Sequence, residues 1–354
     1  MRVLVVASHS AGHIWPAIAF CQGMKHKDRD TRIDFISTDG ELERRLLTNK
    51  FNSVSFLKKE KITILTICNL IVLILRARSI INKQKPDLIV GFGGYLSISF
   101  IICAHFLKIP NFIHEQNFTM GLANRFLAKI TDQVIFSFPN SQISDKLNSK
   151  ALFFGFPIRK EMKLLDKQEA RRRFDLDSNR FTLLVTGGSQ GSVSINNQVL
   201  SFLKDADLKQ IQVIHIAGLS DYERIEQEYR NLGIKNSVLG FVDNMSYAFS
   251  ACDLAVCRAG AGTIAEIVAL RIPSILIPYP YAKKHQLANA SFLSDKNAAV
   301  LIEDKDTCKA ALKEQIIDLM NNSDKLKQLS CALSEINLPD ARERLVELAF
   351  NFIN

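Results

Sequence analysis

The sequence lacks paired cysteines. Its seven cysteines stand at positions 21, 68, 103, 252, 257, 308 and 331, and no two of them form a Cys-x-x-Cys pair. The odd number and the scatter argue against a disulfide framework and against a zinc ribbon, and they favour a reducing compartment. We therefore expect all seven to be buried side chains that behave as small hydrophobic residues.

The sequence also lacks a hydrophobic run long enough to cross a bilayer. The longest apolar stretch, residues 62–75, has 14 residues, whereas a membrane-spanning helix needs about 20. The first residues read Met-Arg-Val-Leu-Val-Val, which is typical of a first strand rather than of a secretory signal. These features predict a cytoplasmic protein without a transmembrane helix.

Composition and charge indicate a globular protein with one basic half. The 354 residues are 47% hydrophobic and 23% charged, which suits about two domains. Residues 1–157 hold 20 Lys and Arg against 11 Asp and Glu, whereas residues 158–354 hold 25 of each. A basic half indicates an anionic membrane, a phosphorylated substrate or a nucleic acid, although a basic surface without a partner fits the charge equally well. No aromatic-rich basic stripe supports nucleic-acid binding.

Short β-rich runs alternate with longer helical patterns along the whole chain, which predicts parallel sheets built from βαβ units. The pattern restarts near residue 180, so an α/β fold with two doubly wound, Rossmann-like domains fits best. We expect a first domain at 1–157, a second at 158–338, and a C-terminal helix, 339–354, that packs back on the first. The expected strands are 2–6, 33–36, 53–57, 87–91, 111–114, 133–136, 181–185, 211–216, 237–239, 253–256 and 274–277.

A glycine-rich loop follows the strand at 181–185. It reads Thr-Gly-Gly-Ser-Gln-Gly over residues 186–191 and precedes a helix. Glycines let a backbone approach a phosphate closely, and a helix N-terminus supplies free N–H groups. A tight turn would need fewer glycines, so we interpret this loop as a phosphate or diphosphate site. It is not a P-loop, because no Gly-Lys-Ser/Thr follows.

A second glycine turn follows the strand at 253–256. Gly260, Gly262 and Ala265 match a dinucleotide fingerprint, but that fingerprint requires an acidic residue about 20 positions later, at the end of the next strand. None stands there. Glu266 instead lies one turn into the helix, where its carboxylate would reach ribose hydroxyls.

Polar residues also gather at strand ends in the first half. His13 follows the strand 2–6, on a loop before a helix that Pro16 is placed to start. A lone histidine is more often structural, but one on a strand-end loop is a candidate base or anchor. Gly-Gly-Tyr at 93–95 and His-Glu-Gln-Asn at 114–117 follow two further strands.

Taken together, these stretches resemble the MurG family of peripheral membrane glycosyltransferases. That family adds N-acetylglucosamine from UDP-GlcNAc to undecaprenyl-diphospho-muramoyl-pentapeptide (lipid I), which gives lipid II. The resemblance covers nearly the whole chain in order. It rests on the motifs Ser10-Ala11-Gly12-His13, Gly93-Gly94-Tyr95, His114-Glu115-Gln116-Asn117, Gly155-Phe156-Pro157-Ile158-Arg159, Gly187-Gly188-Ser189-Gln190-Gly191, Cys257-Arg258-Ala259-Gly260 with Glu266, and His285-Gln286 before Asn289-Ala290.

The resemblance implies the GT-B fold, in which two Rossmann-like domains flank a cleft, and it implies roles for named residues. Ser189 and the helix after it would hold the diphosphate, and Glu266 the ribose. Arg159 and Asn117 would reach in from the hinge and the first domain. The remaining substrate-binding residues would be Ser10, Ala11, Gly12, Val242, Ala261, Gly262, Thr263, Ile264, Ala265 and Gln286.

The first loop departs from the family pattern. The family usually has Gly-Gly-Thr-Gly-Gly-His, whereas this chain has Ser8-His9-Ser10-Ala11-Gly12-His13. The resemblance implies inverting single displacement that forms a β-1,4 linkage, with His13 assisting removal of the proton from the acceptor hydroxyl. UDP would leave with its charge met by helix N-termini and Arg159.

No metal or other cofactor is expected. Asp-x-Asp triplets occur at 28–30, 175–177, 205–207 and 304–306, but they stand in charged segments away from the expected site. We interpret them as solvated faces. No cluster of histidine and cysteine offers a tight metal site.

The stretch at 62–75 predicts the membrane contact. It is flanked by Lys58, Lys59, Lys61, Arg76, Arg78, Lys83 and Lys85. Apolar residues edged by cations suit the headgroup layer of an anionic membrane. A buried helix with a basic end is the alternative, and the uninterrupted apolar positions 70–75 indicate that part of the stretch is core.

Three other functions remain open from the sequence. A related transferase with another lipid acceptor, such as diacylglycerol, would share the fold. A nicotinamide-dependent oxidoreductase would use the second glycine turn, although the missing acidic residue counts against it. A non-catalytic sugar-nucleotide-binding protein would fit the altered first loop.

Overall fold

The computed structural model describes most of the chain, and by its packing the chain divides into two compact units. The first unit is residues 1–160 with residues 338–354, and the second is residues 161–337. The described residues are 1–8, 10–58, 66–139, 149–205, 210–282, 285–305 and 308–353.

The first unit is a parallel sheet of seven strands in the order β3-β2-β1-β4-β5-β6-β7. Its strands are rich in β-branched residues, and the central ones are buried on both faces, as parallel strands between helices must be. The elements are β1 (Arg2–Val6), α1 (Ala11–Lys27), β2 (Arg32–Thr38), α2 (Glu41–Leu47), β3 (Ser53–Leu57), α3 (Thr66–Gln84), β4 (Leu88–Gly91), α4 (Tyr95–Leu107), β5 (Asn111–Glu115), α5 (Leu122–Leu127), β6 (Gln133–Phe136), β7 (Ala151–Phe153) and α14 (Arg342–Asn351).

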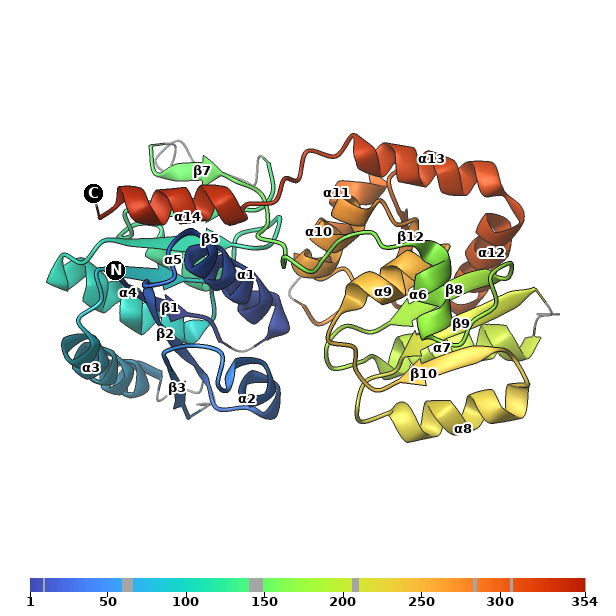
Figure 1. The fold of residues 1–354 in the computed structure, drawn as a ribbon, viewed down its shortest axis with the longest axis horizontal. Coiled ribbons are helices and arrows are strands. Elements are labelled where there is room, and N and C mark those ends of the chain that lie inside the picture. The colour runs from blue at the N-terminus through green and yellow to red at the C-terminus, as the bar shows by residue number, and fades with distance from the viewer. Residues whose placement is uncertain are drawn as a thin grey trace. The chain divides into compact units, whose positions relative to one another are not determined.

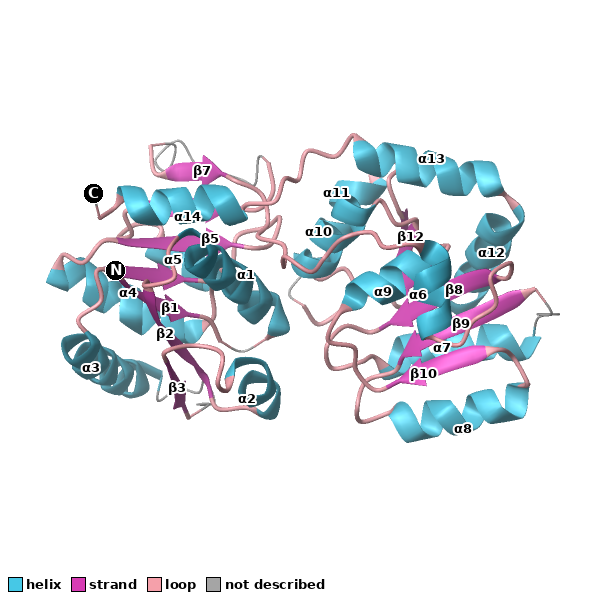
Figure 2. Ribbon diagram, viewed as in Figure 1, coloured by secondary structure: helices cyan, strands magenta, loops and turns pink. Residues whose placement is uncertain are grey.

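Helices cover both faces of this sheet (Figures 1 and 2). One apolar cluster joins Val3 and Val5 to α1, α2 and α14, and the other joins Leu4 and Val6 to α3, α4 and α5. The last helix, α14, therefore belongs to the first core. It lies against α1, where a Cβ at Gly23 would come within 2.9 Å of the Val346 side chain.

The second unit is a parallel sheet of six strands in the order β10-β9-β8-β11-β12-β13. One face packs against α7, α8 and α12, and buried Phe249 and Ile264 belong to α9 and α10, which lie over the other. The elements are α6 (Lys167–Arg173), β8 (Phe181–Thr186), α7 (Val193–Asp205), β9 (Ile211–Ile216), α8 (Tyr222–Leu232), β10 (Asn236–Leu239), α9 (Met245–Ala251), β11 (Leu254–Cys257), α10 (Ala261–Leu270), β12 (Ser274–Leu276), α11 (His285–Ser294), β13 (Val300–Leu301), α12 (Cys308–Asn321) and α13 (Ser323–Ser334).

The expectation of two doubly wound parallel sheets is confirmed. The structure adds two short strands that the sequence did not predict, β7 and β13. It also begins α1 at Ala11, so Pro16 lies inside the helix rather than at its start. Among the described residues, no helix combines the length and the apolar character that crossing a membrane requires.

Among the cysteines whose side chains the structure describes, all but one are buried. Cys21, Cys103, Cys252 and Cys257 are buried, as expected, and burial raises the pKa of the Cys252 thiol to about 12. Cys331 is exposed, so the expectation was wrong there. The side chains of Cys68 and Cys308 lie outside the described part of the structure.

Candidate active site

Loops after three neighbouring strands of the first unit meet at one edge of its sheet. The strands β1, β4 and β5 are parallel neighbours, so their carboxyl ends lie together, where ligands bind in this kind of sheet. A Cβ at Gly94, after β4, would collide with the Ser8 side chain after β1. A Cβ at Gly93 would lie 3.4 Å from the Gln116 side chain after β5. The three loops are thus in direct contact.

His13 lies in the first turn of α1 and is half-buried. Its Nδ1 lies 2.8 Å from the carbonyl oxygen of Ser8 and 3.5 Å from the Ser10 hydroxyl. A carbonyl oxygen only accepts hydrogen bonds, so Nδ1 carries the proton that is donated to Ser8. In the neutral form of the ring, Nε2 then holds the lone pair.

The glycines after β4 shape the space beside this imidazole. Gly93 and Gly94 have φ angles of +93° and +83°, which side chains rarely adopt. A Cβ at Gly93 would come within 2.9 Å of both Cδ2 and Nε2 of His13. A side chain at position 93 would therefore displace the His13 ring, and only glycine allows the ring to keep its present position.

Glu115 organises the loop after β5. Its buried carboxylate accepts hydrogen bonds from the backbone N–H groups of Asn117 and Gly121, both at 3.0 Å, and from the Asn124 amide at 2.8 Å. These contacts fix the backbone of half-buried Asn117 at the sheet edge. The neighbouring Gln116 donates to the carbonyl oxygen of Phe92 at 2.7 Å, which ties this loop to the glycines.

His114 is a structural histidine. It is fully buried, its ring lies between Phe92 and Phe156, and its Nε2 lies 3.2 Å from the Ser137 hydroxyl. Burial lowers the pKa of His114 to about 3, so the ring is neutral at physiological pH. His114 is therefore unsuited to accept a proton at this edge, and His13 remains the candidate base.

Arg159 lies on the first unit, against α1. Its guanidinium stacks on the Trp15 ring at 4.1 Å from the centroid, and the residue is only 5% exposed. Trp15 stands two positions after His13. The sequence did not predict that Trp15 contacts Arg159. The stacking holds Arg159 beside the helix that carries the candidate base.

In the second unit, the loop after β8 turns tightly on its glycines. Gly188 and Gly191 have φ angles of +86° and +77°. A Cβ at Gly187 would collide with the backbone of Ser192, and one at Gly191 with the backbone of Ala217. Nothing lies within 4 Å of a Cβ built at Gly188, so the loop is open on that side. It leads into α7, whose N-terminal N–H groups suit an anion.

The turn after β11 leads into α10 at Ala261. Gly262, Thr263 and Glu266 are half-buried, whereas Ile264 and Ala265 are fully buried in the domain core. Ile264 and Ala265 are therefore enclosed in the core, and the structure does not expose them to a ligand. Glu266 lies one turn into the helix, as the sequence predicted.

Gln286 stands at the second position of α11. Its side-chain oxygen accepts a hydrogen bond from the Tyr279 N–H at 2.9 Å. The side-chain nitrogen of Gln286 is then the group that can donate hydrogen bonds to a ligand. Nearby, the Asn289 amide donates to the carbonyl oxygen of Ala259 at 3.1 Å, which ties α11 to the second glycine turn. Val242 is half-buried in the loop after β10.

Asp304 overturns one prediction. The triplet at 304–306 was interpreted as a solvated face away from the site, but the Asp304 side chain is only 10% exposed and pairs with Arg258 at 2.8 Å. The interpretation failed because β13 brings Asp304 to the carboxyl edge of the sheet, beside the second glycine turn. Within the described ranges, no three His, Cys, Asp or Glu side chains gather as a metal ion would require.

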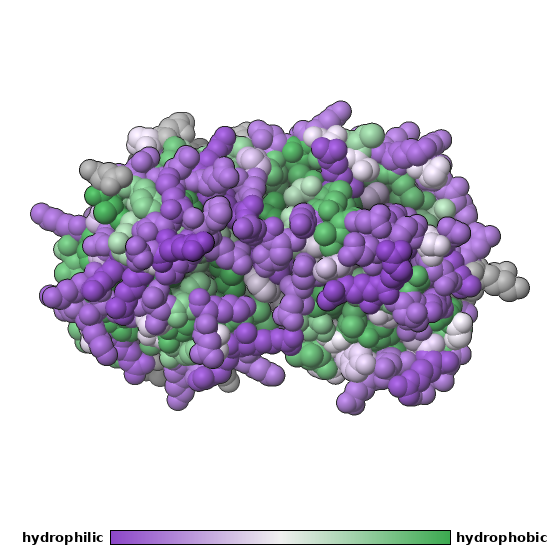
Figure 3. All heavy atoms as spheres, in the orientation of Figure 1, coloured by the Kyte–Doolittle hydropathy of each residue, from purple (hydrophilic) through white to green (hydrophobic). Residues whose placement is uncertain are grey.

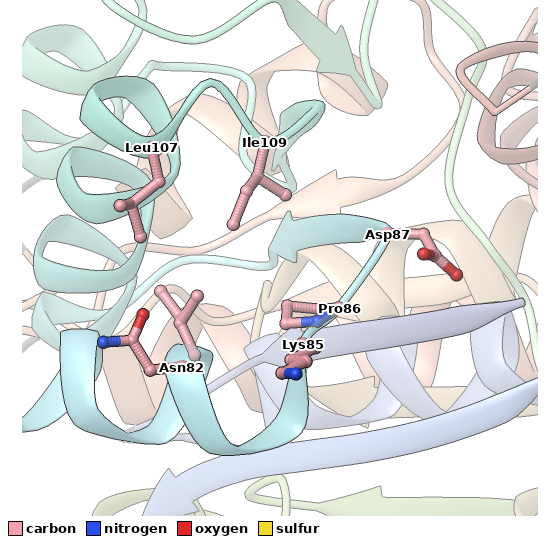
Figure 4. Close-up of a pocket in the computed structure, with 7 residues that line it drawn as sticks. Asn82, Lys85, Pro86, Asp87, Leu107 and Ile109 are labelled. Carbon is pink, nitrogen blue, oxygen red and sulfur yellow. The ribbon is translucent and has the colours of Figure 1, made fainter.

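A surface hollow of about 610 Å³ lies at the opposite edge of the first sheet (Figure 4). Its residues precede β4 and β5 or end α3 and α4, so it opens at the amino edge, where this fold does not bind its ligands. The hollow is lined by Ile81, Asn82, Lys85, Pro86, Asp87, Leu107 and Ile109.

Two family models match the chain. The glycosyltransferase family 28 N-terminal domain matches residues 3–136, and the glycosyltransferase family 28 C-terminal domain matches residues 182–345. A relative from Halalkalibacterium halodurans is 34% identical over 98% of this chain and 98% of its own length. A relative from Thermodesulfovibrio yellowstonii is 35% identical over 99% of this chain and 98% of its own length. Both are named UDP-N-acetylglucosamine--N-acetylmuramyl-(pentapeptide) pyrophosphoryl-undecaprenol N-acetylglucosamine transferase.

Solved structures share the fold. The crystal structure of MurG from Acinetobacter baumannii is 24% identical, with a TM-score of 0.78 over 99% of this chain and 100% of that chain. UDP-GlcNAc 2-epimerase from Neisseria meningitidis, bound to UDP-GlcNAc, is 13% identical, with a TM-score of 0.66 over 100% of this chain and 99% of that chain. At these identities the likeness concerns the fold alone.

Proposed function

The chain belongs to glycosyltransferase family 28, and we infer that it transfers N-acetylglucosamine from UDP-GlcNAc to the C4 hydroxyl of MurNAc in undecaprenyl-diphospho-MurNAc-pentapeptide. This reaction converts lipid I into lipid II in peptidoglycan synthesis. One observation carries the inference: relatives named for this transferase are 34% and 35% identical over 98% and 99% of the chain. The family membership also sets aside a nicotinamide-dependent oxidoreductase.

The donor would bind to the second unit. The open side of Gly188 and the N-terminus of α7 suit the diphosphate, with Ser189 as a side-chain donor. Glu266 of α10 would accept hydrogen bonds from the ribose hydroxyls. The amide of Gln286 would donate to the sugar, because its oxygen is already engaged by Tyr279. The pocket would be completed by Val242, Ala261, Gly262 and Thr263.

The acceptor would bind to the first unit. Ser10, Ala11 and Gly12 lead into the first turn of α1 beside His13, and Asn117 stands on the neighbouring loop. Backbone N–H groups at the N-terminus of α1 suit the diphosphate of the lipid acceptor, because a helix N-terminus attracts anions.

The chemistry would be a single displacement with inversion at the anomeric carbon. Nε2 of His13 accepts the proton of the MurNAc C4 hydroxyl as the oxygen attacks C1 of N-acetylglucosamine, and the bond from C1 to the UDP oxygen breaks. The geometry supports this role, because in the neutral ring the hydrogen bond from Nδ1 to the Ser8 carbonyl puts the lone pair on Nε2. Helix N-termini and Arg159 would stabilise the negative charge on the departing UDP.

The protein would act as a peripheral protein at the cytoplasmic face of the inner membrane. On α3 the side chains of Ile71, Val72 and Leu75 are 53%, 43% and 61% exposed, while Leu73 is 4% exposed and belongs to the core. Exposed Arg76 and Arg78 follow in the next turn. An apolar stripe edged by cations suits an anionic headgroup layer. Lys59, Lys61 and residues 62–65 lie outside the described residues.

Phe106 is another exposed apolar side chain of the first unit. Phe106, at the end of α4, is 78% exposed, and α4 packs against α3. In the view of Figure 3, hydrophobic areas are separated by hydrophilic side chains rather than joined into one broad surface. The few exposed apolar side chains of α3 suit docking on a headgroup layer rather than deep insertion.

The decisive experiment incubates the purified protein with labelled UDP-GlcNAc and a short-chain lipid I analogue. The expected product is the β-1,4-linked disaccharide lipid, together with one UDP for each transfer. Transfer to diacylglycerol instead would identify another lipid glycosyltransferase. Tight binding of UDP-GlcNAc without any transfer would indicate a non-catalytic nucleotide-sugar-binding protein.

A further inference from the structure

Asp304 is the centre of a buried polar network in the second unit. Its carboxylate accepts hydrogen bonds from the Ser194 hydroxyl at 2.6 Å, from the Gln198 amide at 2.9 Å and from Arg258 Nη1 at 2.8 Å. Ser194 and Gln198 lie in the first two turns of α7. The carboxylate therefore joins the start of α7 to the residue that leads into the second glycine turn.

Arg258 extends the network to the first glycine loop. Its Nη2 donates to the Ser192 hydroxyl at 2.6 Å, and its Nη1 also donates to the carbonyl oxygens of Ile277 and Pro278 at 3.1 and 3.2 Å. The Ser192 hydroxyl in turn accepts a hydrogen bond from the Ile195 N–H at 3.3 Å, in the first turn of α7. Both terminal nitrogens of the guanidinium are thus engaged by protein acceptors.

The two ends of the first glycine loop lie in direct contact. A Cβ at Gly187 would collide with the Ser192 backbone, so the backbone of Gly187 closely approaches that of Ser192. The position of Ser192 therefore bears on the position of Gly187 across the loop 187–192.

We propose that Asp304 is a positioning residue for the donor, because it holds Arg258 and the start of α7 so that the loop 187–192 and the start of α10 keep a fixed geometry. Asp304 acts through Arg258, Ser192 and Ser194 and touches no substrate. The proposal rests on the proposed function, since the two loops are the expected diphosphate and ribose sites.

The charges of the pair fit a positioning role. Burial alone would raise the pKa of the Asp304 carboxyl, but the hydrogen bonds from Ser194 and Arg258 outweigh it and lower the pKa. Asp304 is therefore an anion, and it neutralises Arg258 beside the helix end that is to receive the diphosphate. Without Asp304, the guanidinium of Arg258 would be a buried cation that lacks its carboxylate partner and one hydrogen-bond acceptor.

The test measures UDP binding by calorimetry and initial rates with both substrates. Asp304→Ala is expected to weaken UDP binding and to raise the KM for UDP-GlcNAc at least about tenfold, because charged hydrogen bonds to three groups are lost. The KM for the lipid acceptor should stay within about twofold, since the first unit is untouched. Asp318→Ala, which removes a surface ion pair with Lys325 in the same unit, is the matched control and should change neither value.

A double variant separates positioning from stability. Arg258→Met with Asp304→Leu replaces the buried pair by apolar side chains, which often preserves or restores stability. If the pair positions the loop, this variant should recover its melting temperature but keep the weakened UDP binding. Recovery of UDP binding together with stability would overturn the proposal.

Two further outcomes are decisive. If Asp304→Ala does not fold, Ser194→Ala, which deletes one hydrogen bond on the same carboxylate, should still weaken UDP binding, and unchanged binding there would overturn the proposal. A wild-type protein that fails to bind UDP would refute the proposed function itself. A wild-type protein that binds UDP as tightly as a folded Asp304→Ala variant would refute only the positioning role.

Discussion

The Nδ1 atom of His13 lies 2.8 Å from the carbonyl oxygen of Ser8. This contact fixes the tautomer of the ring, because the carbonyl oxygen can only accept. It also fixes the orientation of the ring, since Ser8 is fully buried at the end of the central strand β1. In the proposed mechanism Nε2 is consequently the atom that would accept the proton, and Gly93 lies beside it.

Replacing His13 with Ala should lower kcat by at least about 10²-fold, because a positioned base contributes about 10²–10⁴-fold to rate. UDP affinity should change little, since the nucleotide is expected on the other unit. Steady-state kinetics and calorimetry measure the two quantities. His9→Ala, at a position outside the described residues, serves as the control and should keep most of the activity. Near-normal turnover in the His13 variant together with loss in the His9 variant would move the base to His9.

Gly93→Ala should lower kcat while leaving UDP affinity unchanged. The added Cβ would lie 2.9 Å from the His13 ring, so the imidazole must shift from its bond to Ser8. Gly233→Ala is the matched control, because Gly233 also has a positive φ, +63°, but nothing lies within 4 Å of its added Cβ. Both variants should lose about 1–2 kcal/mol of stability from backbone strain, and only Gly93→Ala should lose turnover. Equal kcat in the two variants would contradict the contact.

The sequence predicted the strands with a strong pattern and missed those without one. Buried runs such as β1 and β8 have four or more consecutive apolar or β-branched residues. The missed strands β7 and β13 have three and two residues and are only half-buried. Their position is decided by pairing with β6 and β12, which no local pattern encodes.

The candidate site was predicted where it follows strands and missed where it depends on distant contacts. His13, Gly93 and the loop 187–191 stand directly after strands, so the fold alone brings them to the ligand edge. Asp304 stands among Glu303, Lys305 and Asp306 and was mistaken for a solvated residue, because its partner Arg258 lies 46 positions earlier. The stacking of Arg159 on Trp15 was missed for the same reason.

Glu266→Ala should weaken UDP binding by about 10-fold to 100-fold, since a hydrogen bond to a charged group contributes about 1.5–3 kcal/mol. The carboxylate lies one turn into α10, at the height expected for the ribose. Glu226→Ala removes two contacts on the surface of α8, the ion pair with Arg230 and the hydrogen bond from the Tyr222 hydroxyl, and should leave binding unchanged. Calorimetry with UDP distinguishes the two variants. Unchanged affinity in Glu266→Ala would remove that residue from the site.

Vesicle binding should depend on the charges beside the exposed face of α3. Arg76→Glu with Arg78→Glu should reduce binding to vesicles that contain anionic phosphatidylglycerol, and wild-type binding should fall as salt rises, because exposed charges are screened. The control reverses Arg172 and Lys309, two exposed cations of the second unit, and should bind as the wild type does. Sedimentation with vesicles measures each case. Equal binding to neutral vesicles, or binding that does not depend on salt, would contradict the membrane role of α3 and support the interpretation of α3 as a core helix.

Two buried histidines should make the fold sensitive to acid. Burial lowers the pKa of His114 in the first unit and of His215 in the second, each from 6.5 to about 3. His215 lies between the Tyr229 hydroxyl and the Asn196 side-chain oxygen, both at 3.0 Å. Above pH 6.5 both rings are neutral in the folded and unfolded chains, so they add no dependence on pH.

Below that pH the two histidines bind protons in the unfolded chain but not in the folded chain. The free energy of unfolding therefore falls as pH drops from about 6.5 towards 3. pH 5 lies about 1.5 units below the pKa of the unfolded chain, and one unit corresponds to about 1.36 kcal/mol. At pH 5 each histidine should therefore lower the free energy of unfolding by about 2 kcal/mol. His215→Gln should be less stable than the wild type at pH 7.5 but should lose less between pH 7.5 and 5, because its site no longer titrates. His105→Gln, at an exposed position, is the control and should follow the wild type. Melting temperatures across this range decide the matter, and parallel curves for His215→Gln and the wild type would show that His215 does not carry the acid sensitivity.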